Sequence, residues 1–152
     1  MENNKENSVS FGVLSIETTS FDMVSVPMEE FEDIMKEKGA FSVSLRIDSR
    51  IKKDTNHFSV SMTTTLRSIK SKEIDLIKHT GETNFLLSNL EGFFVKEKDA
   101  FDLPEDLLVQ LYGISYSHCR ALLSSELKNT SYNNLYILPI IDPKQLLVKT
   151  KL

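Results

Sequence analysis

The 152-residue sequence has no tryptophan, only one cysteine, four prolines and five glycines. The single cysteine, Cys119, cannot form an internal disulfide, and a chain with only one cysteine fits a reducing compartment. The glycines are isolated from one another, so the sequence contains no glycine-rich phosphate-binding loop. These shortages exclude a disulfide-bonded scaffold and the common nucleotide-binding loops.

Long hydrophobic runs and an excess of positive charge are also missing. No stretch approaches the roughly 18 consecutive apolar residues of a membrane span, and residues 1–8 are polar, unlike a signal peptide. The chain has 22 acidic and 18 basic residues, a formal charge of −4. Because nucleic-acid phosphates require a clustered positive surface, this balance disfavours nucleic-acid binding. We therefore expect a cytoplasmic protein that inserts into no membrane and binds no nucleic acid directly.

Candidates for catalysis and metal binding are few. The three histidines, His57, His79 and His118, fall in different expected elements and form no set at metal-ligand spacing. His118 and Cys119 are adjacent, but neighbouring side chains on a helix diverge by about 100°. Free cysteine usually behaves as a small buried hydrophobe. We predict a core cysteine beside a surface histidine, with no metal, cofactor or enzymatic activity. A small enzyme with a pocket around His118 and Cys119 is a competing hypothesis.

What the chain does have is enough apolar residues for one core. Hydrophobic residues make up 40% of the sequence, and a chain of this length buries roughly two-thirds of its unfolded surface without a metal or disulfide. The sequence shows no internal repeat and no low-complexity tract. We expect a flexible tail at residues 1–8 and a single domain at residues 9–152.

The clearest pattern lies in two segments that flank a short polar connection. Apolar and polar residues alternate strictly from Phe41 to Asp48 and again from Phe58 to Arg67, with a turn-like stretch at residues 53–56 between them. Period-two alternation on both sides of a short connection predicts an antiparallel hairpin with one buried face.

The remaining strands have weaker signals. Residues 9–26 are rich in β-branched residues and phenylalanine, which predicts a first strand with its alternation broken near residues 18–20. Residues 27–39 predict a short amphipathic helix or an ordered loop. Residues 68–83 are mixed and charged, and we expect a connection there with a helical turn at residues 74–77. A fourth strand is expected at residues 84–95, where Gly92 suggests a bulge or a close approach of backbone.

Two helices are expected near the C-terminus. Asp102 and Glu105 resemble a capping box with Pro104 in the first turn, and leucines then recur at helical spacing to about residue 128. Gly113 could mark a break in this helix. A shorter helix follows a cap at Asp142. Strands followed by helices, without β–α–β alternation, predict an α+β fold with helices on one face of an antiparallel sheet.

An apolar stretch joins the first two strands, from Phe21 to Met35. Methionine and phenylalanine suit surfaces that accept varied apolar partners, because they can repack against many shapes. The alternative is that these side chains simply close the core. The acidic run at residues 29–33 has a similar pair of interpretations, a docking surface for a basic partner or a solvated helix face.

The C-terminal third resembles the SecB export chaperones. The stretch from Tyr116 to Ser125, followed by Tyr132 and the segment from Tyr136 to Asp142, is similar to the family's long helix and the proline-containing loop after it. Pro139 matches the loop proline. Upstream, Phe85-Leu86-Leu87 with Gly92-Phe93-Phe94 resembles the fourth strand of the family, and Ser20-Phe21 resembles the first. The resemblance covers nearly the whole chain as an order of short motifs.

The resemblance implies a four-stranded antiparallel sheet packed against a long helix, with a short final helix, assembled as a homotetramer that is a dimer of dimers. It also implies an ATP-independent holdase for unfolded clients, with grooves between the crossover of the first two strands, the sheet and the last helix. On this interpretation the client-binding residues are Phe21, Met23, Val26, Met28, Phe31, Ile34, Met35, Leu146 and Leu147.

The chain departs from the SecB pattern at the surface where that family docks the translocation motor ATPase. The SecB family has an acidic residue in its fourth strand. The residues of this chain that resemble that stretch, 86–88, include no acid, and the next acid is Glu91. Glu17 and Asp22 could supply part of an acidic docking patch. This departure favours relatives that protect one dedicated client, such as an antitoxin, over a chaperone of secretory precursors. A non-chaperone assembly module that binds one folded partner is the alternative from another class.

Overall fold

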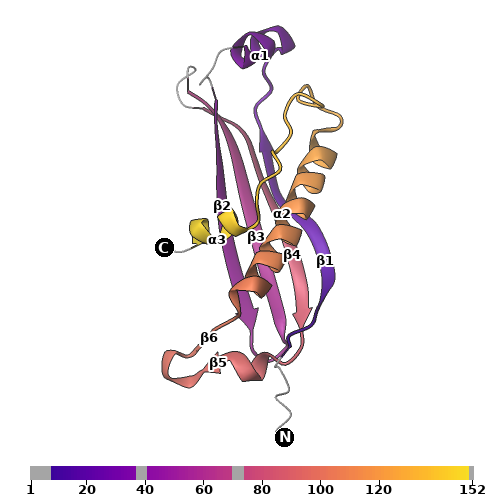
Figure 1. Ribbon diagram of the computed structural model, residues 1–152. Helices are drawn as coiled ribbons and strands as arrows, with labels where there is room; N and C mark the ends of the chain where they lie inside the picture. Colours follow the sequence, from indigo (N-terminus) through magenta and orange to yellow (C-terminus); the bar gives the residue numbers. More distant parts are fainter. Residues whose placement is uncertain (1–7, 37–40, 70–73, 151–152) are drawn as a thin grey trace, which may run out of the picture.

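The chain folds as a four-stranded antiparallel sheet with a long helix across one face (Figure 1). This computed structural model describes residues 8–36, 41–69 and 74–150. The main elements are β1 (Phe11–Met23), α1 (Met28–Met35), β2 (Phe41–Lys52), β3 (His57–Ser68), β4 (Ile74–Leu87), α2 (Glu105–Leu127) and α3 (Lys144–Thr150). Between β4 and α2 lie η1 (Leu90–Phe93), β5 (Phe94–Val95), η2 (Lys96–Lys98) and β6 (Ala100–Phe101). The predicted α+β class, with four strands and two C-terminal helices, is confirmed.

The predicted hairpin is the pair β2 and β3. Their residues pair in unbroken register from Phe41 opposite Ser68 to Lys52 opposite His57. Asn56 in the turn has φ of 55°, a left-handed conformation that asparagine tolerates better than most residues. The apolar residues of β3, from Phe58 to Leu66, are buried beneath α2, as their alternation predicted.

The irregularity predicted in the first strand is also present. The register between β1 and β4 shifts between Thr18 and Ser20, and a second shift lies between Val13 and Ser15. β1 pairs with β4, so the strand order is β1-β4-β3-β2 and the first two strands lie at opposite edges of the sheet.

The prediction for residues 68–95 is wrong. Residues 74–83 form most of β4, not a connection with a helical turn, and the strand ends at Leu87, before the expected bulge. Gly92 lies in the 3₁₀ helix η1. The helix-facing residues of β4 include His79, Gly81 and Thr83, which are buried although they are not hydrophobic. The period-two pattern of β4 was missed in the sequence because alternation is judged by hydrophobicity, and these three buried residues do not count as hydrophobic.

The two C-terminal helices differ from the prediction mainly at their starts. Pro104 takes the N-cap position of α2 without a side-chain cap, so the expected capping box at Asp102 is wrong. Asp142 does cap α3, because its Oδ1 accepts a hydrogen bond from the backbone N of Lys144 at 3.0 Å. Gly113 lies inside an unbroken α2. A Cβ there would be 3.1 Å from the ring of Pro143, so the glycine allows the chain before α3 to approach the helix.

The core lies between α2 and the sheet. The helix approaches the sheet closely at Gly81 of β4. A Cβ at Gly81 of β4 would be 3.4 Å from the Cα of Cys119 and 3.2 Å from the side chain of Leu122. An alanine there would need the side chain of Leu122 to shift by a few tenths of an ångström. None of the helices in the described parts of the chain is long and apolar enough to span a membrane. The tail predicted at residues 1–8 falls, except for Ser8, outside the described residues.

Candidate functional site

The β1–β2 crossover (residues 24–40, of which 24–36 are described) passes over the end of the sheet. Because β1 and β2 lie at opposite edges, the chain must cross three strand spacings of about 4.8 Å each. The helix α1 lies in this crossing, beyond the end of the strands (Figure 1). Phe31 of α1 is 2% exposed, and its ring lies against Tyr132 at 4.9 Å and Phe41 at 5.7 Å between centroids.

The α2–α3 loop (residues 128–143) lies beside this crossover and is bonded to it. The hydroxyl of Tyr132 donates a hydrogen bond of 2.6 Å to the carbonyl oxygen of Val24. Further along the loop, Arg120 Nε donates to the Leu138 carbonyl at 2.9 Å, and the Tyr116 hydroxyl donates to the Pro139 carbonyl at 2.7 Å. Two side chains of α2 therefore hold the extended part of the loop in place.

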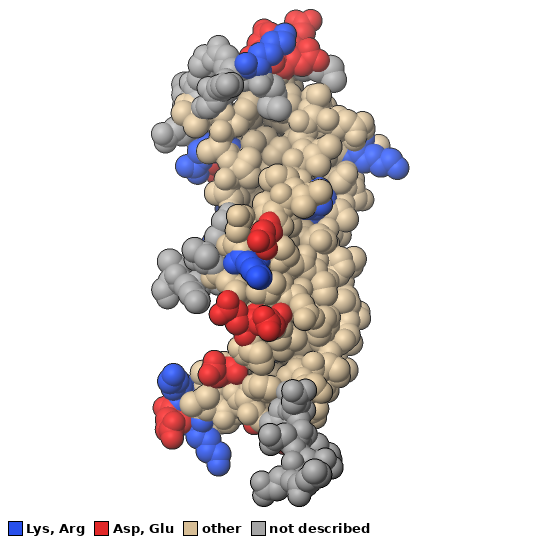
Figure 2. Space-filling view, viewed as in Figure 1, with Lys and Arg blue, Asp and Glu red and all other residues tan. Residues whose placement is uncertain are grey.

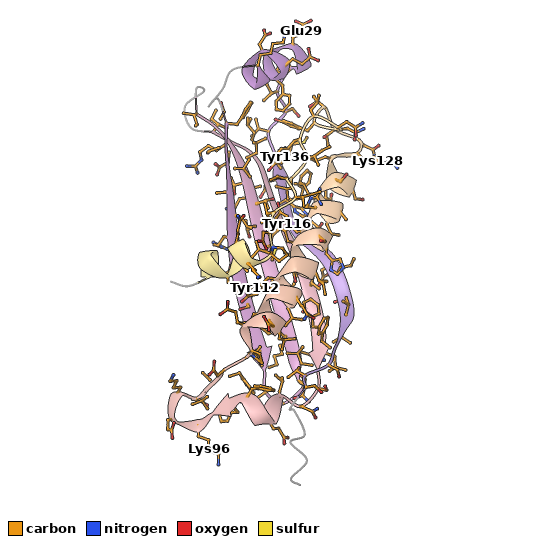
Figure 3. All side chains as sticks on the ribbon, viewed as in Figure 1. Glu29, Lys96, Tyr112, Tyr116, Lys128 and Tyr136 are labelled. Atoms are coloured by element: carbon orange, nitrogen blue, oxygen red, sulfur yellow. The ribbon has the colours of Figure 1, made fainter. Side chains whose placement is uncertain are left out.

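Holding the loop in this way turns two isoleucines outward. Tyr136 and Leu138 are buried, whereas Ile137 is 66% exposed and Ile140 is 85% exposed. Figure 3 shows Tyr136, Tyr116 and Tyr112 one below another along α2, close to the course of the loop. The exposed isoleucines are thus presented by a fixed main chain, which is the arrangement of an apolar binding surface.

The predicted client-binding residues occupy three kinds of position. Phe31, Leu146 and Leu147 are buried in the core, and Phe21, Met23 and Val26 are partly buried against it. The side chains of Met28, Ile34 and Met35 lie outside the described residues. Client contact by this set stays a prediction.

Sequence reasoning missed the exposed pair Ile137 and Ile140. The available signal was an apolar run around Pro139 with neither helical nor strand period, but such a run gives no direction for individual side chains. The loop's hydrogen bonds to α2 decide which side chains point outward.

A second apolar region follows the edge of the sheet. Val13, Leu14 and Ile16 of β1 are 47%, 50% and 45% exposed. Beside them, α2 has only Arg120 as a charged residue between Asp106 and Glu126. Figure 2 shows correspondingly few charged side chains over α2 and β1. An apolar face with so few charges is typical of a surface that another chain covers.

The sheet face opposite α2 is polar. Backbone register aligns three acids and one serine in a row across the four strands, formed by Glu17, Glu82, Ser61 and Asp48. The Glu82 carboxylate accepts hydrogen bonds from Ser61 Oγ at 2.9 Å and Asn84 Nδ2 at 3.2 Å.

The presence of Glu82 corrects the expectation that the fourth strand lacks an acid before Glu91. That expectation placed the strand too late in the sequence, because β4 begins at Ile74. Of the three predicted docking residues, Glu17 and Asp22 lie on the polar face of β1, and Glu91 is exposed in η1.

The Cys–His pair considered from the sequence is not formed. Cys119 is 1% exposed, and burial raises the pKa of its thiol to about 11, so it is protonated at neutral pH. The imidazole nearest to its sulfur is His79, with Nδ1 at 3.8 Å, while His118 Nδ1 lies 3.1 Å from Thr83 Oγ1. A buried, protonated thiol is a poor nucleophile. Within the described residues, no group of three or more His, Cys, Asp or Glu side chains could hold a metal.

The buried His79 and the partly buried His118 predict a pH dependence of stability. Burial lowers the pKa of His79, partly offset by Glu126, and burial also lowers the pKa of His118 below its usual 6.5. The unfolded chain therefore binds more protons than the folded one just below pH 6.5, so the free energy of unfolding falls as pH decreases through that value. We expect a loss of up to about 1.4 kcal/mol per pH unit for each histidine, measured by urea unfolding between pH 7.5 and 5.5.

The matched variant for this prediction is His79→Gln, whose amide can still bond to Thr18, the partner of His79 Nε2 at 3.0 Å. Its unfolding free energy should fall less steeply than that of the parent over the same pH range. Equal slopes in the two proteins would show that His79 is not the group that titrates.

The element order and sheet topology define a SecB-like fold. Among solved structures, the chain is similar to the SecB-like chaperone Rv1957 of Mycobacterium tuberculosis, solved in complex with a ChAD peptide from the HigA1 antitoxin Rv1956. The two share 12% identity and a TM-score of 0.50 over 86% of this chain and 89% of that one. A likeness at this identity establishes the fold alone.

The match to a protein of unknown function from Streptococcus agalactiae covers 88% of this chain and 99% of that chain, at 11% identity. Its TM-score of 0.28 carries no argument. No family model matches the chain, and no curated protein matches it.

Proposed function

We propose that this protein is an ATP-independent holdase that binds unfolded or partly folded polypeptide segments in the cytoplasm and catalyses no reaction. The observation that carries this proposal is the presentation of Ile137 and Ile140 by a loop that is bonded to α2, on a SecB-like fold. Unfolded chains expose apolar side chains that folded proteins bury, so an apolar surface on a fixed main chain can bind them without sequence specificity.

The holdase acts as a homotetramer built as a dimer of dimers. The exposed apolar residues of β1 and the largely uncharged surface of α2 support this assembly, because both could be covered by a second copy. β1 has no strand partner on its outer edge among the described residues. Several weak client sites on one particle then act together, and avidity raises the overall affinity.

Two kinds of client fit this chaperone, and they differ in what the polar sheet face does. For secretory precursors, the acids Glu17, Asp22 and Glu82 of the sheet and Glu91 of η1 would contribute to docking of the translocation motor ATPase. For a dedicated antitoxin, no motor is required. We favour the antitoxin, since the solved neighbour was captured with an antitoxin peptide. An affinity pull-down from the native cells would recover either one small protein with its toxin or many precursors.

The experiment that tests the holdase proposal is suppression of aggregation without nucleotide. Equimolar tetramer should keep a chemically unfolded protein in solution after dilution from denaturant, as measured by light scattering. Addition of ATP should change nothing. Unaltered scattering at every ratio of holdase to client would contradict the proposal.

An assembly module that binds one folded protein is the second candidate. It is favoured by the cross-strand hydrogen bonds of the polar face, which include a bond of 2.8 Å between Thr63 Oγ1 and Thr80 Oγ1 as well as those to Glu82. Such bonds fix a flat polar surface suited to a folded partner. Selective binding of a native protein, with none of unfolded chains, would favour this candidate.

A further inference from the structure

The crossover places one of its own aromatic side chains in a slot beside the start of the α2–α3 loop. The slot is formed by Tyr132 from the α2–α3 loop and Phe41 from the start of β2. The ring of Phe31 meets that of Tyr132 edge to face, at an interplanar angle of 87°, and Phe31 is 2% exposed. This is the geometry in which aromatic side chains attract one another.

The helix that carries Phe31 has little else to hold it among its described side chains. Glu29, Glu32 and Asp33 are exposed, and the ion pair between Asp33 and Lys36 lies on the surface. A helix of eight residues is marginally stable in water by itself, so α1 depends on what its buried residue contacts. Among the described side chains of α1, Phe31 is therefore the one whose contacts hold the helix in place.

Exposed apolar residues surround the slot. Val43 lies two residues from Phe41 on the same face of β2 and is 51% exposed. Ile74 pairs with Ser68, which also pairs with Phe41, so it lies in the same row of the sheet, and it is 40% exposed. On the crossover side, Val24 is 44% exposed. An extended apolar segment would find contacts on both sides of the slot that the ring of Phe31 now occupies.

We propose that α1 is an internal plug, in which Phe31 occupies the slot that an aromatic side chain of the client enters, so that client binding requires α1 to leave. This inference rests on the proposed holdase function and adds a control of client binding. The occupied slot is itself the evidence for its ligand chemistry, because it already accommodates an aromatic ring between two others.

The plug sets the apparent affinity. Burial of one phenylalanine corresponds to roughly a 10- to 100-fold factor in an equilibrium constant. Because a client can bind only the undocked form, its affinity for the intact protein is lowered by about the same factor. In the absence of clients the plug also covers apolar surface that would otherwise promote self-association.

The test uses substitutions that remove no buried atom. Glu32 is exposed in the middle of α1, and Glu32→Pro breaks the helix by removing a backbone donor and crowding the preceding turn. Glu32→Ala removes the same charge but keeps the helix, and serves as the matched control. The probe is a reduced, carboxymethylated protein that stays unfolded, and its dissociation constant is measured by fluorescence anisotropy in full-length protein.

Glu32→Pro should bind the probe about 10- to 100-fold more tightly than the parent, and Glu32→Ala should match the parent. Equal or weaker binding by Glu32→Pro, with the parent binding normally, would overturn the plug and leave the holdase function intact. If neither the parent nor the variants bind the probe, the holdase function itself fails.

A second measurement follows the plug directly. The protein has no tryptophan, so Phe31→Trp creates a single fluorescent reporter in the slot. Its emission should shift to longer wavelength when the probe saturates the protein, as the indole moves into water. Emission that stays unchanged at saturation would show that residue 31 remains in the slot, against the plug.

Discussion

Leu146→Ala is expected to lower the free energy of unfolding by about 2–5 kcal/mol, or to release α3 from the body of the protein. Leu146 is 0% exposed, and its removal leaves a cavity between α3 and the core. The measurement is urea unfolding followed by circular dichroism. The matched control is Gln145→Ala, whose exposed side chain on the same helix should change the unfolding free energy by less than about 0.5 kcal/mol.

This result bears on the client-binding role predicted for Leu146 and Leu147. Because both side chains are buried, their removal should weaken client binding only through a loss of folded protein or of α3 docking. Client affinity measured per folded molecule should therefore stay near that of the parent. A large fall in that affinity, with unfolding unchanged, would mean that the two leucines face the client and that α3 moves during binding.

The double variant Ile137→Glu and Ile140→Glu is expected to weaken client binding by about 100-fold with an unchanged midpoint of thermal unfolding. Burial of an isoleucine against a partner contributes roughly 1.5–3 kcal/mol, and an inserted carboxylate would have to be desolvated as well. Neither side chain packs in the core, since Ile137 is 66% exposed and Ile140 is 85% exposed. The measurement pairs anisotropy with the unfolded probe and calorimetry of the free protein.

The control for the double variant adds the same two charges to the same loop without removing apolar surface. Ser131 and Asn133 are exposed on the α2–α3 loop, so Ser131→Glu with Asn133→Glu should leave client affinity within about threefold of the parent. Equal losses in both double variants would show that charge repels the client, and that the isoleucines are not its contacts.

Some elements of the fold could be predicted because their residues report local geometry directly. The hairpin of β2 and β3 repeats apolar and polar residues with period two, and the crossover helix repeats them with the helical period. β4 could not be placed, since His79, Gly81 and Thr83 face α2 where apolar residues are expected. His79 is buried there with Thr18 as hydrogen-bond partner, and Gly81 lies where α2 approaches the strand closely.

The client-binding set predicted from the sequence came from the crossover and the last helix, and client contact by it stays a prediction. The exposed loop residues Ile137 and Ile140 were not in that set, whereas Phe31, Leu146 and Leu147 were, and these three are buried. Hydrophobicity is the same property whether a residue closes the core or faces a partner, so composition cannot separate the two.

The sequence by itself determined the α+β class, the β2–β3 hairpin with its buried face, the long C-terminal helix and the cap of the last helix, because periodicity and capping are local properties of the chain. The tertiary structure alone decided which apolar side chains remain at the surface. Two hydrogen bonds from α2 to the carbonyls of Leu138 and Pro139 orient Ile137 and Ile140 outward, and the slot between Phe41 and Tyr132 takes Phe31 in. Both depend on residues far apart in sequence, whose contacts exist only once the sheet and helix have packed.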